Sequence, residues 1–208
     1  MFSPLAGFLK RFRKVEPYSI VLDDLCSRLN VRLGDDLVLW VRVRGKGGKA
    51  AVVRAFGLKF VLADVSSVPI AYHEFAHVIQ FYFYNRSVVK VVFHSIKSFL
   101  SSVFWRKTVN TVKAFEEGFA DYITFDVVGF PVPDLLENAG RSAEKCGRLK
   151  FALLSYNSYV FGRAYYLLLE KAFGREHALK VGLSDPETFK RECLRAQEIL
   201  KETLPRLS

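Results

Sequence analysis

Several features that would assign the chain to a common structural class are missing from its sequence. The three cysteines, Cys26, Cys146 and Cys193, lie far apart and form no CxxC pair. This pattern excludes a disulfide-stabilised scaffold and a cysteine-based metal site, and it predicts free, mostly buried thiols in a reducing compartment. No apolar run reaches the roughly 18 to 20 residues that a membrane-spanning helix requires.

The N-terminus also lacks a recognisable targeting signal. Its first residues, MFSPLAGFLKRFRK, contain no apolar run long enough for the core of a signal peptide, and the basic residues follow the apolar ones. We therefore expect a cytoplasmic location. No linker, low-complexity segment or internal repeat divides the chain, and half of its 208 residues are hydrophobic. One folded domain over residues 1–208 is the expected organisation.

Histidine is scarce, with four residues in the chain, yet two of them lie close together in the segment IAYHEFAHVI. His73, Glu74 and His77 form an HExxH motif, and positions four residues apart share one face of an α-helix. Both imidazoles can then reach one metal ion, with Glu74 beside a metal-bound water. This is the layout of a zinc hydrolase. The alternative is a chance spacing of two histidines on a core helix.

The pattern of apolar residues around this motif predicts a helix, three strands and a second helix. The first helix is expected over residues 18–29, and the strands at Leu37–Val43, Ala50–Phe56 and Lys59–Val65. The HExxH helix is expected over residues 68–84, because two serines precede it as N-cap candidates. The strands predict a small, mostly antiparallel sheet packed on the HExxH helix.

The rest of the chain shows mainly helical periodicity. Helices are expected over residues 87–105, 109–125, 134–146 and 149–173, and the sequence SDPE at 184–187 opens a final one. The predicted fold class is therefore α+β in a single domain. It combines a small N-terminal antiparallel sheet with a mainly helical C-terminal half, and the metal is expected between these two parts.

A third zinc ligand is expected in the segment AFEEGFADYITF, residues 114–125. Catalytic zinc takes three protein ligands and keeps one position for water. Glu117 and Asp121 lie four residues apart, so Glu117 can ligate the metal while Asp121 accepts the other ring N–H of a ligating histidine. A solvated acidic face is the alternative. The neighbouring residues are apolar, however, and a buried carboxylate needs a partner.

The motifs HEFAH and EEGFADY together resemble those of the gluzincin metallopeptidases, the group that contains thermolysin and the NEGFA-type aminopeptidases. The resemblance implies a zincin-like fold with one Zn2+ bound by His73, His77 and Glu117. It implies that Glu74 is the general base and that Asp121 supports a histidine, with His73 as the expected one.

A third segment, SYNSYVFGRAYYLLLEKAFG, extends this resemblance. In NEGFA-type enzymes a tyrosine three residues before a glycine stabilises the oxyanion, and the matching residue here is Tyr159, before Gly162. A phenol O–H directed at the developing tetrahedral oxygen would serve this purpose. Tyr156 and Tyr165 are rival candidates, and a core tyrosine with a satisfied hydroxyl is the alternative.

Two features depart from the gluzincin pattern. The gap between His77 and Glu117 is 39 residues long, which is more than gluzincins usually have. No GxMEN-like segment, which aminopeptidases of this group use to hold the substrate N-terminus, precedes the HExxH helix. The choice between endopeptidase and exopeptidase therefore stays open.

The long gap forms an insertion in which residues 78–115 include no aspartate or glutamate. Lysines and arginines alternate there with aromatic residues, and the whole chain has a net charge of +10. Such a segment could dock on an anionic membrane surface or on a protein. A helical hairpin with a solvated basic face is the alternative. Single-stranded nucleic acid also suits this composition, but no recognised nucleic-acid-binding motif supports it.

Two functions remain as hypotheses. The first is a zinc-dependent peptidase that acts on peptides or proteins, in the cytoplasm or peripherally at the membrane. The second is a zincin-fold protein whose metal site is structural or vestigial, acting as a membrane-surface or protein-docking module. In both, residues 1–67 form the N-terminal helix and sheet, 68–125 contain the metal motifs and the insertion, and 126–208 form the helical C-terminal part.

Overall fold

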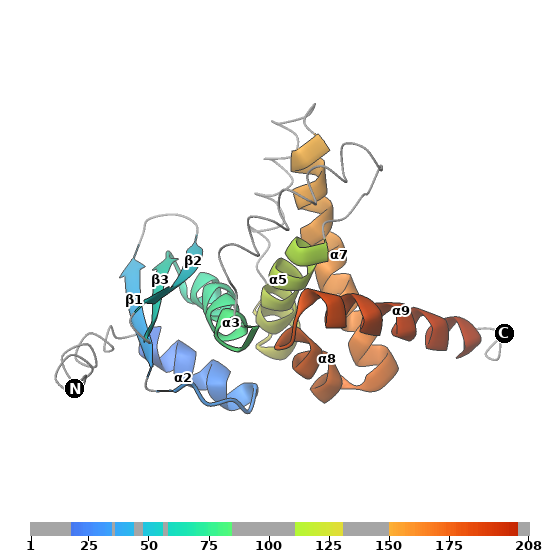
Figure 1. Cartoon of the computed structure of the whole chain (residues 1–208), viewed down its shortest axis with the longest axis horizontal. Helices are drawn as coiled ribbons and strands as arrows, with labels where there is room; N and C mark the ends of the chain where they lie inside the picture. The colour runs from blue at the N-terminus through green and yellow to red at the C-terminus, as the bar shows by residue number, and fades with distance from the viewer. Residues whose placement is uncertain are drawn as a thin grey trace.

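The described part of the chain is mainly helical, with a three-stranded sheet near the N-terminus (Figure 1). The computed structural model describes residues 18–34, 36–43, 48–55, 58–84, 111–130 and 150–203. Its elements are α2 (Tyr18–Arg28), β1 (Leu37–Val43), β2 (Lys49–Ala55), β3 (Leu58–Val65), α3 (Val68–Tyr84), α5 (Thr111–Tyr122), the π-helix η2 (Ile123–Val127), α7 (Lys150–Phe173), α8 (Arg175–Gly182) and α9 (Pro186–Thr203).

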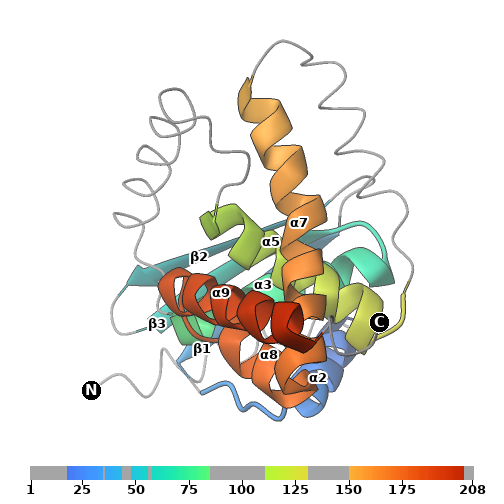
Figure 2. The same cartoon turned by 90° about the vertical axis from the view of Figure 1, so that its right-hand side faces the viewer.

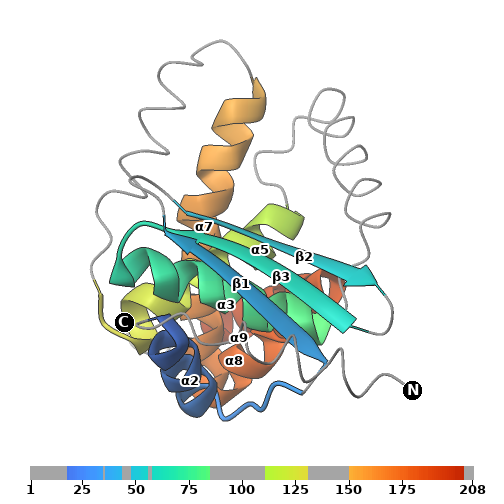
Figure 3. The ribbon, with the colours of Figure 1, turned by 90° about the vertical axis from the view of Figure 1, so that its left-hand side faces the viewer.

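The sheet is mixed, and the prediction of an antiparallel sheet is wrong for one of its two pairings. The strand order is β1-β3-β2, with β3 antiparallel to β2 and parallel to β1. The hydrophobic pattern predicts where strands lie but not their order, because consecutive strands need not be neighbours. Val61, Ala63 and Val65 of β3 alternate along the strand, so they share one face of the sheet, and all three are buried in the same core as the apolar residues of α3. Figure 3 shows the sheet with α3 behind it.

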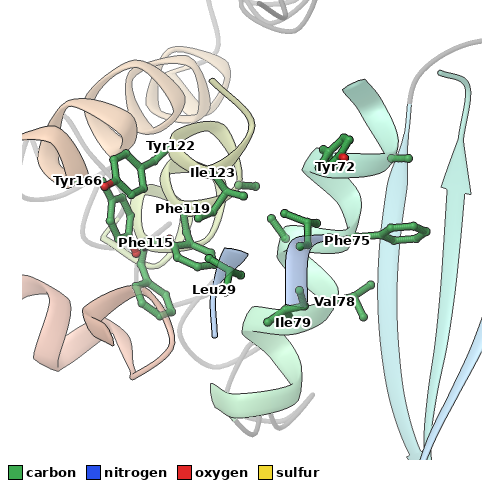
Figure 4. Close-up of a cluster of buried hydrophobic side chains, with 14 of the residues drawn as sticks. Leu29, Tyr72, Phe75, Val78, Ile79, Phe115, Phe119, Tyr122, Ile123 and Tyr166 are labelled. Atoms are coloured by element: carbon green, nitrogen blue, oxygen red, sulfur yellow. Dashed lines mark hydrogen bonds between the residues drawn. The ribbon is translucent and has the colours of Figure 1, made fainter. Parts of the chain in front are cut away.

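Helix α3 lies between the sheet and α5, and it is buried over most of its length (Figure 4). Phe75 points toward the sheet, whereas Phe119 lies on the opposite side of the helix. A helix that is apolar on all sides is stable only when other elements cover it, which accounts for this central position. The predicted extent of residues 68–84 is confirmed, and Ser67 Oγ accepts a hydrogen bond of 3.4 Å from the N–H of Ile70 at its start.

The α5 and α7 backbones touch at two glycines. A methyl group placed on Gly118 would lie 2.3 Å from the carbonyl carbon of Gly162, and one on Gly162 would lie 2.6 Å from the carbonyl oxygen of Ala114. One turn after this contact along each helix, Tyr166 of α7 stacks on Tyr122 of α5, with ring centroids 5.6 Å apart. The contact matters for the site because Gly118 directly follows Glu117.

Replacing Gly118 with leucine is expected to destabilise the chain by about 3 kcal/mol, because the new side chain meets a helix backbone that cannot move aside. Urea unfolding of the variant and the wild type measures this loss. An unchanged free energy of unfolding would show that the backbones of α5 and α7 are not in contact at Gly118 and Gly162.

The C-terminal helices α8 and α9 pack against α7 (Figure 2). The predicted start of α9 is confirmed, since Asp185 accepts hydrogen bonds of 2.9 and 3.0 Å from the N–H groups of Glu187 and Thr188. Helix α8 was not predicted. It follows Gly174, whose φ of 89° turns the chain after α7.

Three further predictions concern the cysteines, the insertion and the absence of a membrane-spanning helix. Cys26 and Cys193 are free, and burial raises their thiol pKa values to about 11 and about 12. Cys146, the predicted helices at 87–105 and 134–146, and residues 85–110 of the insertion lie outside the described residues. Within the described residues, no helix has the length and apolarity needed to cross a membrane.

Candidate metal centre

Two histidines of α3 and one glutamate of α5 meet at the contact between these helices. Glu117 Oε2 lies 3.2 Å from His77 Nε2 and 3.6 Å from His73 Nε2. One ligand atom from each of the three residues lies within 4.8 Å of the others. The structure thus brings together the three residues predicted as zinc ligands, although Glu117 is 40 positions from His77 in the sequence.

The three residues could hold a metal ion, and two of their ligand-atom separations can be compared with those of tetrahedral zinc. Zinc bonds to histidine nitrogen and carboxylate oxygen are roughly 2.0 to 2.2 Å long, which places neighbouring ligand atoms about 3.3 Å apart. The separations of Glu117 Oε2 from the two histidine nitrogens, 3.2 and 3.6 Å, are close to that value. The donor set of two imidazoles and one carboxylate is also that of catalytic rather than structural zinc sites.

Asp121 stands behind His73, on the side away from Glu117. His73 Nδ1 lies 3.1 Å from Asp121 Oδ1, although the two atoms are not aligned for a hydrogen bond. Both side chains are buried, at 4% and 1% exposure. An aspartate in this place would fix the tautomer that leaves Nε2 free for a metal once it accepts the Nδ1–H of the ring. Phe81 supports His77, because the two rings stack with their centroids 5.5 Å apart.

The charges of the site perturb its ionisation. Burial alone would lower the pKa of His73, but the carboxylates of Asp121 and Glu117 outweigh it and raise that pKa to about 10. For Glu117, burial is outweighed by His77 and His73, which hold its pKa well below the usual range. The metal-free site therefore contains a protonated imidazole, and a divalent cation would replace that proton.

The stability of the metal-free chain is expected to depend on pH through His73. Its folded pKa of about 10 exceeds its ordinary value of 6.5, so protonation stabilises the fold fully below about pH 6.5. The contribution is lost as the pH rises through about 10. Urea unfolding with a chelator, for the wild type and His73→Asn, is expected to show a stability difference that shrinks from pH 6.5 to 10. A difference that grows over this range would contradict the assigned charge state.

Glu74, next to His73 on α3, is buried at 6% exposure. Burial raises the pKa of its carboxyl group, while His77 and His73 act in the opposite direction without cancelling the effect. Asp64, near the end of β3, adds to the increase through its negative charge. A raised pKa suits a group that must take up and release a proton near neutral pH.

The remaining predicted site residue is Tyr159, the expected oxyanion stabiliser. Tyr159 lies on α7, one turn before the Gly162 contact with α5, but its side chain and that of Tyr156 are outside the described residues. Tyr165 packs edge-on against Phe189 with ring centroids 6.1 Å apart, as a core residue would. The role of Tyr159 stays a prediction.

Sequence reasoning missed three residues that surround the site. Phe81 has a sequence signal, because it follows His77 by four positions on the same helix. Asp64 has another, as a single acidic residue in the otherwise apolar end of β3. Gly48, which lies against Glu74, gave no signal of its own.

No protein-family model, curated protein or solved structure matches the chain. The assignment of a function therefore depends on the residues and geometry of the site, together with the motif resemblance.

Proposed function

We propose that the chain is a zinc-dependent peptide-bond hydrolase of the gluzincin type, with a zincin-like fold and one Zn2+. The observation that carries the proposal is the convergence of the ligand atoms of His73, His77 and Glu117. Glu74, which carries a carboxyl group, directly follows His73 on the same helix. Three protein ligands of this kind leave one zinc position for water.

Glu74 is the proton carrier in this proposal. Zinc held by the three ligands would act as a Lewis acid toward the scissile carbonyl and would make a neighbouring water more acidic. Glu74 removes the proton of the attacking water and later delivers it to the leaving amine. Asp121 holds the imidazole of His73 in place. The Tyr159 hydroxyl would steady the oxyanion, as the resemblance implies.

The sheet edge next to Glu74 supports a peptide as substrate. Strand β2 is at the edge of the sheet, and Gly48, directly before it, contacts Glu74. An edge strand leaves main-chain N–H and C=O groups available, so an extended peptide can pair with it. In zincins the corresponding edge commonly lines the substrate cleft.

Digestion of an unbiased peptide library, combined with metal analysis, tests the proposal. The purified chain is expected to contain one zinc ion and to cleave library peptides. A chelator is expected to abolish cleavage, and added zinc to restore it. A chain that binds zinc but cleaves no peptide would favour the second candidate, a docking module with a structural metal.

The observation that favours docking is the basic insertion, which has no acidic residue from 78 to 115. We propose that an anionic membrane surface is its partner, either alongside hydrolysis or instead of it. Co-sedimentation with anionic and neutral liposomes, for the chain with and without residues 86–107, tests this. Equal co-sedimentation of both forms would rule out docking by the insertion.

A further inference from the structure

Gly48 leaves the space in which part of the Glu74 side chain lies. A methyl group placed on Gly48 would be 2.5 Å from Glu74 Oε1 and 2.8 Å from Glu74 Cγ. It would also be 2.5 Å from Ile70 Cγ2, one turn earlier on α3. All three separations are shorter than any normal contact, so an alanine at this position would force side chains to move.

The need for glycine here is steric and not conformational. The φ of Gly48 is outside the left-handed region, so an L-residue can adopt its backbone. Gly174 shows the opposite case, with a φ of 89° and open space around it. The atoms that an alanine at position 48 would meet belong to side chains, and the nearest charged one is the flexible end of Glu74.

The direction of the Glu74 carboxylate is therefore tied to residue 48. Glu74 is 6% exposed, which leaves little free volume for its carboxylate to occupy elsewhere without disturbing its neighbours. Because β2 begins at Lys49, which pairs with Asp64 of β3, Gly48 is held at the sheet margin by the strand that follows it.

We propose that Gly48 is a positioning residue, whose missing side chain fixes where the carboxylate of Glu74 points. The proposal rests on the proposed function, in which Glu74 is the general base. Its effect on catalysis runs through Glu74 and requires no contact between Gly48 and the metal.

Gly48→Ala tests this, with Gly34→Ala as the matched control. A methyl group on Gly34 would also meet a carboxylate, 2.8 Å from Asp36 Oδ1, but that carboxylate is not part of the site. Gly48→Ala is expected to lower kcat by about 100-fold, with one zinc ion retained and a much smaller change in KM. Gly34→Ala is expected to keep kcat near the wild-type value. Equal kcat in Gly48→Ala and the wild type would overturn the proposal.

A double-mutant cycle supplies a readout that does not depend on activity. Melting temperatures are measured for the wild type, Gly48→Ala, Glu74→Ala and the double variant. The decrease caused by alanine at position 48 is expected to be smaller when residue 74 is also alanine, because Oε1 and Cγ are gone. Additive decreases would overturn the proposal.

The cycle separates this proposal from the proposed function. A wild type without peptidase activity would refute the hydrolase, while coupling between positions 48 and 74 would still show that they compete for space. If Gly48→Ala does not fold, a folded double variant supports the proposal, and an unfolded one overturns it.

Discussion

Replacing Glu74 with glutamine is expected to lower kcat for peptide hydrolysis by about 10³-fold while the chain retains one zinc ion. The amide has nearly the same shape as the carboxyl group but cannot take up the proton of the attacking water. His73, His77 and Glu117 stay in place, since Glu74 is not among the three residues whose ligand atoms converge. Steady-state kinetics on a cleaved library peptide and zinc analysis of the same sample measure both quantities.

Glu116→Gln is the matched control for this experiment. Glu116 and Glu74 are both 6% exposed, and the substitution is the same, but Glu116 does not belong to the ligand group. Its variant is expected to retain most of the wild-type kcat. Full activity of Glu74→Gln would remove Glu74 from the mechanism, whatever the metal content.

Replacing Glu117 with alanine is expected to leave the chain without stoichiometric zinc and without activity. The substitution removes the carboxylate that approaches both histidines, at 3.2 and 3.6 Å, and two imidazoles alone do not complete a catalytic zinc site. Asp121→Asn is the graded comparison, because it weakens only the support of His73. Its zinc affinity is expected to fall about 10- to 100-fold. Competition with a chromogenic chelator gives both affinities.

A result in which Glu117→Ala keeps one zinc ion at wild-type affinity would contradict the ligand assignment. The metal would then be bound by other residues, or by the two histidines with a ligand that the sequence motifs do not indicate. Asp121→Asn with unchanged affinity would limit Asp121 to a packing role.

The parts of the fold that could be predicted are those set by local patterns. The HExxH helix and all three strands are found within about one residue of the expected ranges, because their apolar periodicity is strong and capping or turn residues bound them. The order of the strands is a tertiary property. The parallel pairing joins β1 to β3, which are separated in the sequence by β2, so no single segment of the sequence encodes it.

The candidate site likewise combines local features, which the sequence predicts, with tertiary features, which it does not. Helical spacing brings His73 and His77 onto one face, and the acidic residue Glu117 in an apolar segment indicates a partner for them. What spacing does not give is the close approach of α5 and α7 at Gly118, or the space that Gly48 leaves for the side chain of Glu74. Both depend on pairs of residues distant in sequence, and a glycine in a sequence looks the same whether it serves a turn or a contact. The π-helix that follows α5 from Ile123 to Val127 was likewise missed, since the expected helix over residues 109–125 did not distinguish π-helical from α-helical turns.

The central claim is that one zinc ion lies between α3 and α5, and a crystal structure measured at the zinc absorption edge tests it most directly. The account predicts a single anomalous peak roughly 2.0 to 2.2 Å from His73 Nε2, His77 Nε2 and a carboxylate oxygen of Glu117. No peak at this place in crystals grown with zinc, or a peak bound by other residues, would contradict it.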